Sequence, residues 1–121
     1  MSAAAGGTAG GAGAGAGDRL GGKVAVVATL PLQPGQRDAA MAVLRGAIEH
    51  THAEPGTQVY LLHTDPKNDD VVVMYEVYDS RDALGAHMSA DWFKAMGPEL
   101  ISLIAGAPTL QILDLVDGKG L

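Results

Sequence analysis

The stretch Glu54–His87, EPGTQVYLLHTDPKNDDVVVMYEVYDSRDALGAH, decides the fold of this chain of 121 residues. It contains a Pro-Gly break and two runs of β-branched and aromatic residues, separated by turn-forming residues at 65–70. Such runs predict strands over 57–64 and 71–79. Because the connection is short and polar, we expect the two strands to pair as an antiparallel hairpin.

Segments on both sides of the hairpin have the periodicity of regular structure. In chain order, they predict a strand over 23–30, a helix from Gln36 to the Pro-Gly break and a helix begun by Ser80. A second helical piece, begun by Ser89 and kinked or interrupted at Gly97-Pro98, and a strand over 109–116 follow. This order is typical of the ferredoxin-like α+β fold. There a βαββαβ unit forms an antiparallel four-stranded sheet with the helices on one face.

Composition divides the chain into three parts. Residues 1–22 are almost entirely Gly, Ala and Ser, which predicts a disordered N-terminal tail. We do not expect these glycines to form a phosphate-binding loop, because no strand precedes them and no Lys-Ser/Thr pair follows. We expect one domain over 23–117 and a frayed C-terminus at 118–121.

Charge and cysteine content exclude several classes of protein. The net charge is −6 with only eight basic residues, so we expect no binding to nucleic acid or to an anionic membrane surface. The absence of cysteine excludes thiol nucleophiles, disulfides, iron–sulfur clusters and cysteine-type zinc sites. No apolar run reaches the ~20 residues that span a bilayer, and the N-terminal residues lack a basic region and an apolar region of Leu or Val, so we expect no secretory signal. We therefore expect a cytoplasmic protein.

The strands predicted over 23–30 and 71–79 are apolar on both faces. Helices on one side of a sheet cover only one of these faces, and an exposed apolar face that is this continuous normally contacts a partner. In a chain this short, a second copy of the same sheet is the simplest cover. We therefore predict a homodimer.

His87 and Glu76 are the candidate catalytic residues. The neutral imidazole of His87 falls on the apolar face of its helix and accepts a proton near physiological pH. The alternative is a core histidine bonded to a backbone carbonyl. Glu76 lies within an apolar strand, where a carboxylate needs a partner. It either orients His87 or a substrate hydroxyl, or pairs with an arginine across a dimer interface.

Four further residues are candidates for substrate binding. The Tyr60 hydroxyl is a potential polar anchor, and His63, near the end of its strand, is placed to line a cavity mouth or to meet water. Trp92 and Phe93 supply aromatic surface, although such residues also serve as core. We expect no metal site, because no carboxylate and histidine cluster has ligand spacing.

Four segments, in order, carry a family resemblance: VAVVATLPLQPGQ (24–36), HAEPGTQVYLLHTD (52–65), VVVMYEVYDSRDALGAH (71–87) and SADWFKAM (89–96). Together they resemble the antibiotic biosynthesis monooxygenase domain family, in particular its small quinol-monooxygenase-like members, over about Val24–Val116. The resemblance implies a dimeric α+β barrel. It also implies a pocket between sheet and helices where quinol-like or polyketide-like aromatics react with dioxygen without metal, flavin or other cofactor. His87 would be the base and Glu76 or Tyr60 a polar anchor.

Haem-degrading relatives share this fold, but three departures argue against that activity. Their haem-ligating histidine follows a motif like FKEAH, whereas this chain has FKAMG and places Gly97 at the ligand position. The asparagine of those relatives aligns near Ala28, and their tryptophan near His87. Two other functions remain open on the same fold: a non-catalytic ligand-binding or stress-response dimer, and an isomerase of small lactones.

Overall fold

The structure, a computed structural model, describes residues 21–121. The predicted disordered tail therefore lies outside the described residues, apart from Gly21 and Gly22, which form a turn before the first strand. The described elements are β1 (Val24–Pro31), α2 (Arg37–Thr51), β2 (Thr57–Asp65), β3 (Asn68–Tyr78), α3 (Arg81–Ser89), α4 (Asp91–Ile101) and β4 (Thr109–Asp114).

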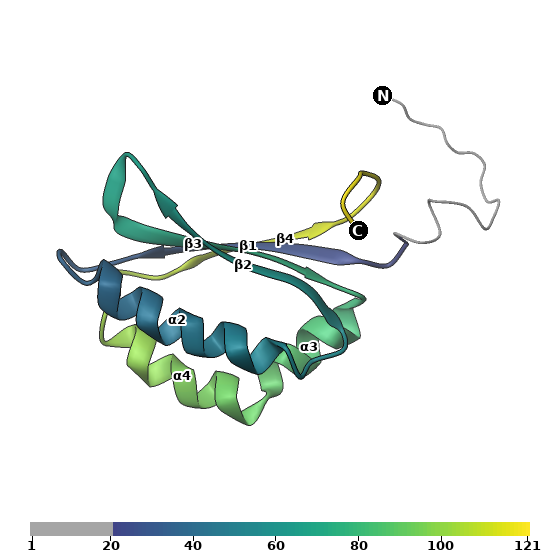
Figure 1. Cartoon of the computed structure of the whole chain (residues 1–121), viewed down its shortest axis with the longest axis horizontal. Helices are drawn as coiled ribbons and strands as arrows, with labels where there is room; N and C mark the ends of the chain where they lie inside the picture. The colour runs from purple at the N-terminus through teal and green to yellow at the C-terminus, as the bar shows by residue number, and fades with distance from the viewer. Residues whose placement is uncertain (1–20) are drawn as a thin grey trace.

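The four strands form one antiparallel sheet in the order β2-β3-β1-β4. All three described helices lie on the same side of this sheet, and none of the described helices covers the other side (Figure 1). The predicted ferredoxin-like α+β fold is confirmed. Among the described residues, no helix is long and apolar enough to cross a membrane.

The central hairpin is tighter than its sequence suggested. Asp65 pairs with Asn68, so only two residues connect β2 to β3. The side chains of Asp65 and Asn68 each accept a backbone N–H from two residues further on, at 2.9 Å in both cases. These short polar side chains stabilise the turn. As a result, β3 begins three residues earlier than predicted.

The hydrophobic core lies between the sheet and the helices. In β1, alternate residues face the helices and stand in register with alternate residues of β3, because side chains of a strand alternate between faces. Helix α2 packs on them through buried residues three and four apart. The fully or nearly fully buried members of this layer are Val26, Ala28, Leu30, Val72, Met74, Ala40, Leu44 and Ala47.

In the last helical region, the predicted Ser89 cap was wrong, and the helix is not interrupted at Pro98. The Ser89 hydroxyl donates to the carbonyl of Ala86 within α3, and α4 begins after Ala90 without a side-chain cap. Pro98 does not interrupt α4, which continues to Ile101. The carbonyl left without a partner by Pro98 belongs to exposed Lys94. Water can therefore bond to it, which lowers the cost of the proline.

The helix-free side of the sheet, which we call the open face, exposes large apolar side chains. Leu61 is 51% exposed, Tyr75 37% and Leu113 42%. Among the described residues, the C-terminal segment 117–121 curls back over one end of this face (Figure 1). There it forms a shallow hollow with strand residues that include Val77.

Candidate functional site

A cavity of about 160 Å³ lies between the sheet and the helices. Its wall is mostly apolar, with Met74 from β3 and Phe93 and Met96 from α4 among the lining side chains. Three residues with polar groups also border it: Tyr60, Glu76 and His87. The sequence had singled out all three, and the fold brings them together.

Helix α3 carries His87 into this wall. The helix begins at Ser80, whose side chain accepts the backbone N–H of Ala83 at 3.1 Å, as predicted for an N-cap. Two residues of α3 are buried, Leu84 and His87, which lie three apart on one face. His87 is only 2% exposed, so its ring is held between the helix layer and the sheet.

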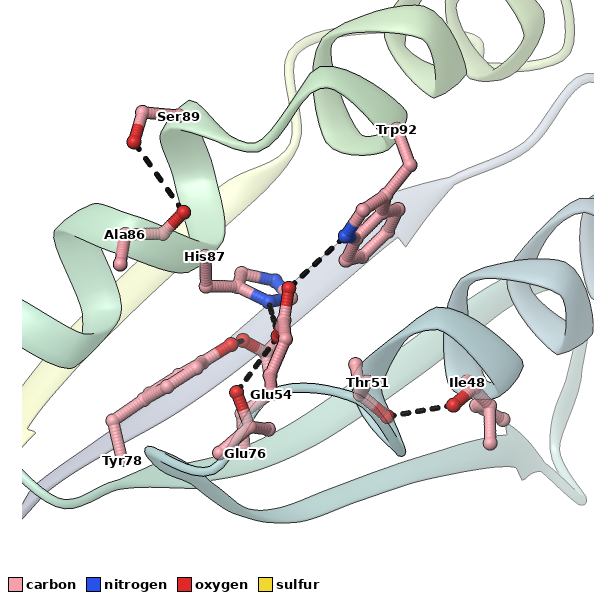
Figure 2. A network of polar contacts seen from close by, with 10 residues as sticks. Ile48, Thr51, Glu54, Glu76, Tyr78, Ala86, His87, Ser89 and Trp92 are labelled. Atoms are coloured by element: carbon pink, nitrogen blue, oxygen red, sulfur yellow. Dashed lines mark hydrogen bonds and ion pairs between the residues drawn. The ribbon is translucent and has the colours of Figure 1, made fainter.

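A carboxylate outside the hairpin strands, Glu54, holds the His87 ring. Its Oε1 atom lies 2.8 Å from Nδ1 of His87 and accepts the Thr57 hydroxyl at 2.8 Å. Its Oε2 atom accepts the indole N–H of Trp92 at 3.0 Å. Figure 2 shows Glu54 between the two rings, so that one carboxylate joins the α2–β2 turn to both α3 and α4.

The turn that presents Glu54 fits closely against α3. The backbone N–H of Asp79 donates to the carbonyl of Gly56 at 2.9 Å, which fixes the turn beside the start of the helix. A Cβ atom at Gly56 would lie 2.7 Å from the Cβ of Ala83. Glycine therefore permits the approach that places Glu54 within hydrogen-bonding distance of His87.

Glu54 is an ionised carboxylate in the folded protein. Burial acts to raise its pKa, but the hydrogen bonds from His87, Thr57 and Trp92 together hold the pKa below its ordinary value. An ionised carboxylate only accepts hydrogen bonds, so the Nδ1 atom of His87 carries a proton. In the neutral ring, Nε2 then has a free lone pair. The described residues give Nε2 no hydrogen-bond partner, and the ring borders the cavity.

Glu76 has a different partner from the one that its sequence position suggested. It is 7% exposed and accepts the Tyr78 hydroxyl at 2.5 Å, so the hydrogen bond that orients His87 comes from Glu54 and not from Glu76. Burial raises the pKa of Glu76, against the opposing effects of the Tyr78 hydrogen bond and the nearby His87. The two carboxyl groups near His87 thus differ: the pKa of Glu54 is lowered, which favours its charged form, and that of Glu76 is raised, which favours its neutral form.

Tyr60 is a hydrogen-bond donor on the cavity wall. Burial, followed by the charges of Glu76 and Glu54, raises the pKa of its hydroxyl, so the group stays protonated. Among the described residues, the hydroxyl has no hydrogen-bond partner, whereas the edge of the ring contacts His87 with centroids 5.1 Å apart. A ligand in the cavity could therefore bond to the Tyr60 hydroxyl as a donor and to Nε2 of His87 as an acceptor.

The remaining predicted binding residues lie in three different places. Phe93 borders the cavity, with its ring centroid 5.1 Å from that of His87. Trp92 lines an outer pocket of about 500 Å³ instead, where it stacks on His50 at 5.0 Å. His63 lies on the open face and contacts the carbonyl of Val73. The described residues contain no cluster of three or more ligating side chains that could hold a metal ion.

Glu54 is the site residue that sequence reasoning missed. Its segment had been interpreted only as the Pro-Gly break that ends a helix, and as part of the family resemblance. Nothing in local spacing links position 54 to position 87. The one available signal was the Glu-Pro-Gly motif itself.

Comparison with known proteins agrees with this architecture. Residues 23–98 match the profile of the family described as antibiotic biosynthesis monooxygenase. The chain belongs to this family. A candidate antibiotic biosynthesis monooxygenase from Caulobacter crescentus CB15, of known crystal structure, is 35% identical, with 81% of this chain and 93% of that chain covered and a TM-score of 0.76.

Two further proteins are similar to this chain, one in structure and one in sequence. The structure of Rv0793 from Mycobacterium tuberculosis is 28% identical, with a TM-score of 0.75 and coverage of 81% of this chain and 99% of that chain. The Synechocystis protein sll1783 is 22% identical over 98 residues, which are 81% of this chain and 67% of the relative.

Proposed function

We propose that this family member is a cofactor-independent monooxygenase that oxidises quinol-like aromatic substrates with dioxygen. The observation that carries the proposal is the buried imidazole of His87, with Nδ1 bonded to a carboxylate, Nε2 without a partner among the described residues, and the ring bordering an apolar cavity. Such a ring is arranged to take a proton from a substrate held in a dry site.

The proposed reaction starts when Nε2 of His87 takes the proton of a phenolic hydroxyl. The resulting anion passes one electron to dioxygen, and the two radicals combine at a ring carbon to give a peroxide. The peroxide takes the proton back from His87. Loss of water, formed from the outer peroxide oxygen, its proton and the ring hydrogen, leaves a new carbonyl on the ring. A hydroquinone and dioxygen thus give a hydroxyquinone and water.

Cavity size favours a substrate with one aromatic ring. An engineered apolar cavity of about 150 Å³ in another protein holds benzene, and the cavity here has a similar volume of about 160 Å³. A polyketide-like substrate with several fused rings would have to displace side chains at the wall. The Tyr60 hydroxyl would donate a hydrogen bond to the second substrate oxygen, the one that does not give its proton to His87, and so orient the substrate ring.

We also propose that the functional unit is a homodimer joined through the open faces. The support is the exposure of Leu61, Tyr75 and Leu113 on a sheet surface that no helix covers. An apolar patch of this kind, built from strands on a small domain, is best buried against a second copy.

The experiment is oxygen consumption with phenols and hydroquinones of one, two and three rings. We expect uptake with single-ring hydroquinones and a loss of about 10²–10⁴-fold in His87→Ala, because a general base contributes this much. His52→Ala, an exposed histidine at the end of α2, is the matched control and should keep full activity. Uptake that is equal in His87→Ala and the original protein would overturn the assignment.

A binding function is the competing outcome. In that case no phenol would cause oxygen uptake, yet a single-ring phenol would raise the melting temperature in a dose-dependent way. The rise would be lost when the cavity is filled by Ala28→Leu, since Ala28 borders the cavity and is buried.

A further inference from the structure

Glu54 is hydrogen-bonded to side chains from three elements of the fold, β2, α3 and α4. It accepts three hydrogen bonds, from His87, Thr57 and Trp92, and its side chain is 19% exposed whereas that of His87 is 2% exposed. The carboxylate therefore lies behind the ring, on the side away from the interior, and its Oε1 atom is bonded to the ring nitrogen.

We propose that Glu54 is the positioning residue of this site, which holds His87 in the tautomer that keeps Nε2 unprotonated toward the cavity. The inference rests on the proposed function for its catalytic meaning, because only a base needs that lone pair. Glu54 itself does not touch the substrate. It fixes the ring through Nδ1–H and stabilises the imidazolium that forms when Nε2 takes a proton.

The geometry predicts a specific result for Glu54→Gln. A glutamine amide has one acceptor and one donor end, whereas the carboxylate accepts at both ends. The indole N–H of Trp92 is only a donor, so the amide oxygen must turn toward Trp92 to avoid two donors meeting. The amide NH₂ then faces His87 and Thr57.

Both of those groups can adapt to a donor. The Thr57 hydroxyl can accept a hydrogen bond, and Nδ1 of His87 can accept one if the proton moves to Nε2. The substitution therefore keeps all three hydrogen-bonded contacts of residue 54, but it reverses the His87 tautomer. A base becomes a donor that points at the substrate, while the fold and the ring position stay the same.

Trp92→Phe in the Glu54→Gln background should reverse this effect. Without the indole N–H, the amide is free to turn its oxygen toward His87 and Thr57, which restores the proton on Nδ1. A structural role for Glu54 predicts no such rescue, because the second substitution removes another contact.

The experiment measures the His87 tautomer in the full chain by ¹⁵N NMR, at a pH where further base no longer changes the ring signals. We expect Nδ1–H in the original protein and in Trp92→Phe, Nε2–H in Glu54→Gln, and Nδ1–H again in the double variant. Glu49→Gln, on the exposed side of α2, removes the same charge and should leave the tautomer unchanged. Oxygen uptake should follow the tautomer, with a loss of about a hundredfold in Glu54→Gln and recovery in the double variant.

Two results would overturn the inference: Nε2–H in the original protein, or a tautomer that Glu54→Gln leaves unchanged. The NMR arm needs no substrate, so it separates this inference from the proposed function. If the tautomer series follows the expected order while no phenol causes oxygen uptake, Glu54 positions His87 as described and the monooxygenase proposal alone fails.

Discussion

The two faces of the sheet are built from the same strands but carry different groups. In β3, the face toward the helices bears Met74 and Glu76, which border the cavity, and the open face bears Tyr75 and Val77. The helix-covered face contains Tyr60 and Tyr78, whose rings contact His87. From 71 to 77, the open face bears only side chains without a formal charge.

This difference shows how one hairpin can serve two purposes. Alternation along a strand places adjacent residues on opposite faces, so chemistry and assembly can be encoded in neighbouring positions without competing for space. A polar group on the covered face must find a partner or border the cavity, because water is excluded there. On the open face, the absence of charge favours contact with another apolar surface.

The largest effect is expected from truncating equivalent leucines on the two faces. Leu30→Ala, at a 6% exposed position on the covered face, should lower the free energy of unfolding by about 2–5 kcal/mol. Leu61→Ala, at a 51% exposed position, should lower the free energy of unfolding by less. If a partner covers Leu61, this loss should become smaller as the protein is diluted. Urea unfolding at several protein concentrations checks this. Equal losses that do not depend on concentration would contradict the distinction between the faces.

A charge on the open face should separate the dimer. Leu61→Asp would bury an unpaired carboxylate at the interface, and we expect the dissociation constant to rise at least about a hundredfold, or roughly 2.7 kcal/mol. Sedimentation should then show a folded monomer. Ala42→Asp, on the exposed side of α2, is the control and should remain dimeric. A folded monomer of the original protein at micromolar concentration would rule out the dimer.

The close contact between α3 and the turn that presents Glu54 is the basis of the next prediction. Gly56→Ala places a Cβ atom 2.7 Å from the Cβ of Ala83, which forces α3 away and should destabilise the protein by about 1–3 kcal/mol. Thermal unfolding measures the loss, and the His87 ring signals should shift as its contact with Glu54 lengthens.

Two variants distinguish this steric effect from a general effect of alanine. Gly85→Ala, in the same helix α3 with open space around it, should stabilise by up to about 1 kcal/mol. Adding Ala83→Gly to Gly56→Ala should recover much of the loss. If that double variant is as unstable as Gly56→Ala, the close approach is not the reason for the glycine.

The fold could be predicted from the sequence because its signals are local. The β-branched apolar runs of β1 and β3, the polar turn at 65–68 and the Ser80 cap each depend on a few neighbouring residues, and the order of elements selected the topology. Three of the site residues, Tyr60, Glu76 and His87, could also be predicted, because a polar residue within an apolar pattern can be recognised from the sequence alone. The role of Glu54 could not be predicted. Either Glu54 or Glu76 could in principle bond to His87, and only the packing of the α2–β2 turn on α3 determines that it is Glu54.

The smallest effect is expected from the pH dependence of Glu76. Its folded-state pKa is raised above 4.5, so the folded protein binds a proton more tightly than the unfolded chain does. Stability from this group is complete below pH 4.5 and is lost as the pH rises through the raised value. Glu76→Gln keeps an acceptor for Tyr78 but cannot ionise, and it should therefore be more stable than the original protein at pH 8 by about 1 kcal/mol.

Denaturant midpoints between pH 4 and pH 8 measure this difference in stability, with Glu99→Gln on the exposed side of α4 as the control. Glu54 has the opposite sign, because its lowered pKa gives stability that is lost as the pH falls. If the curves of Glu76→Gln and the original protein run parallel, the covered face does not discriminate between the two carboxyl groups.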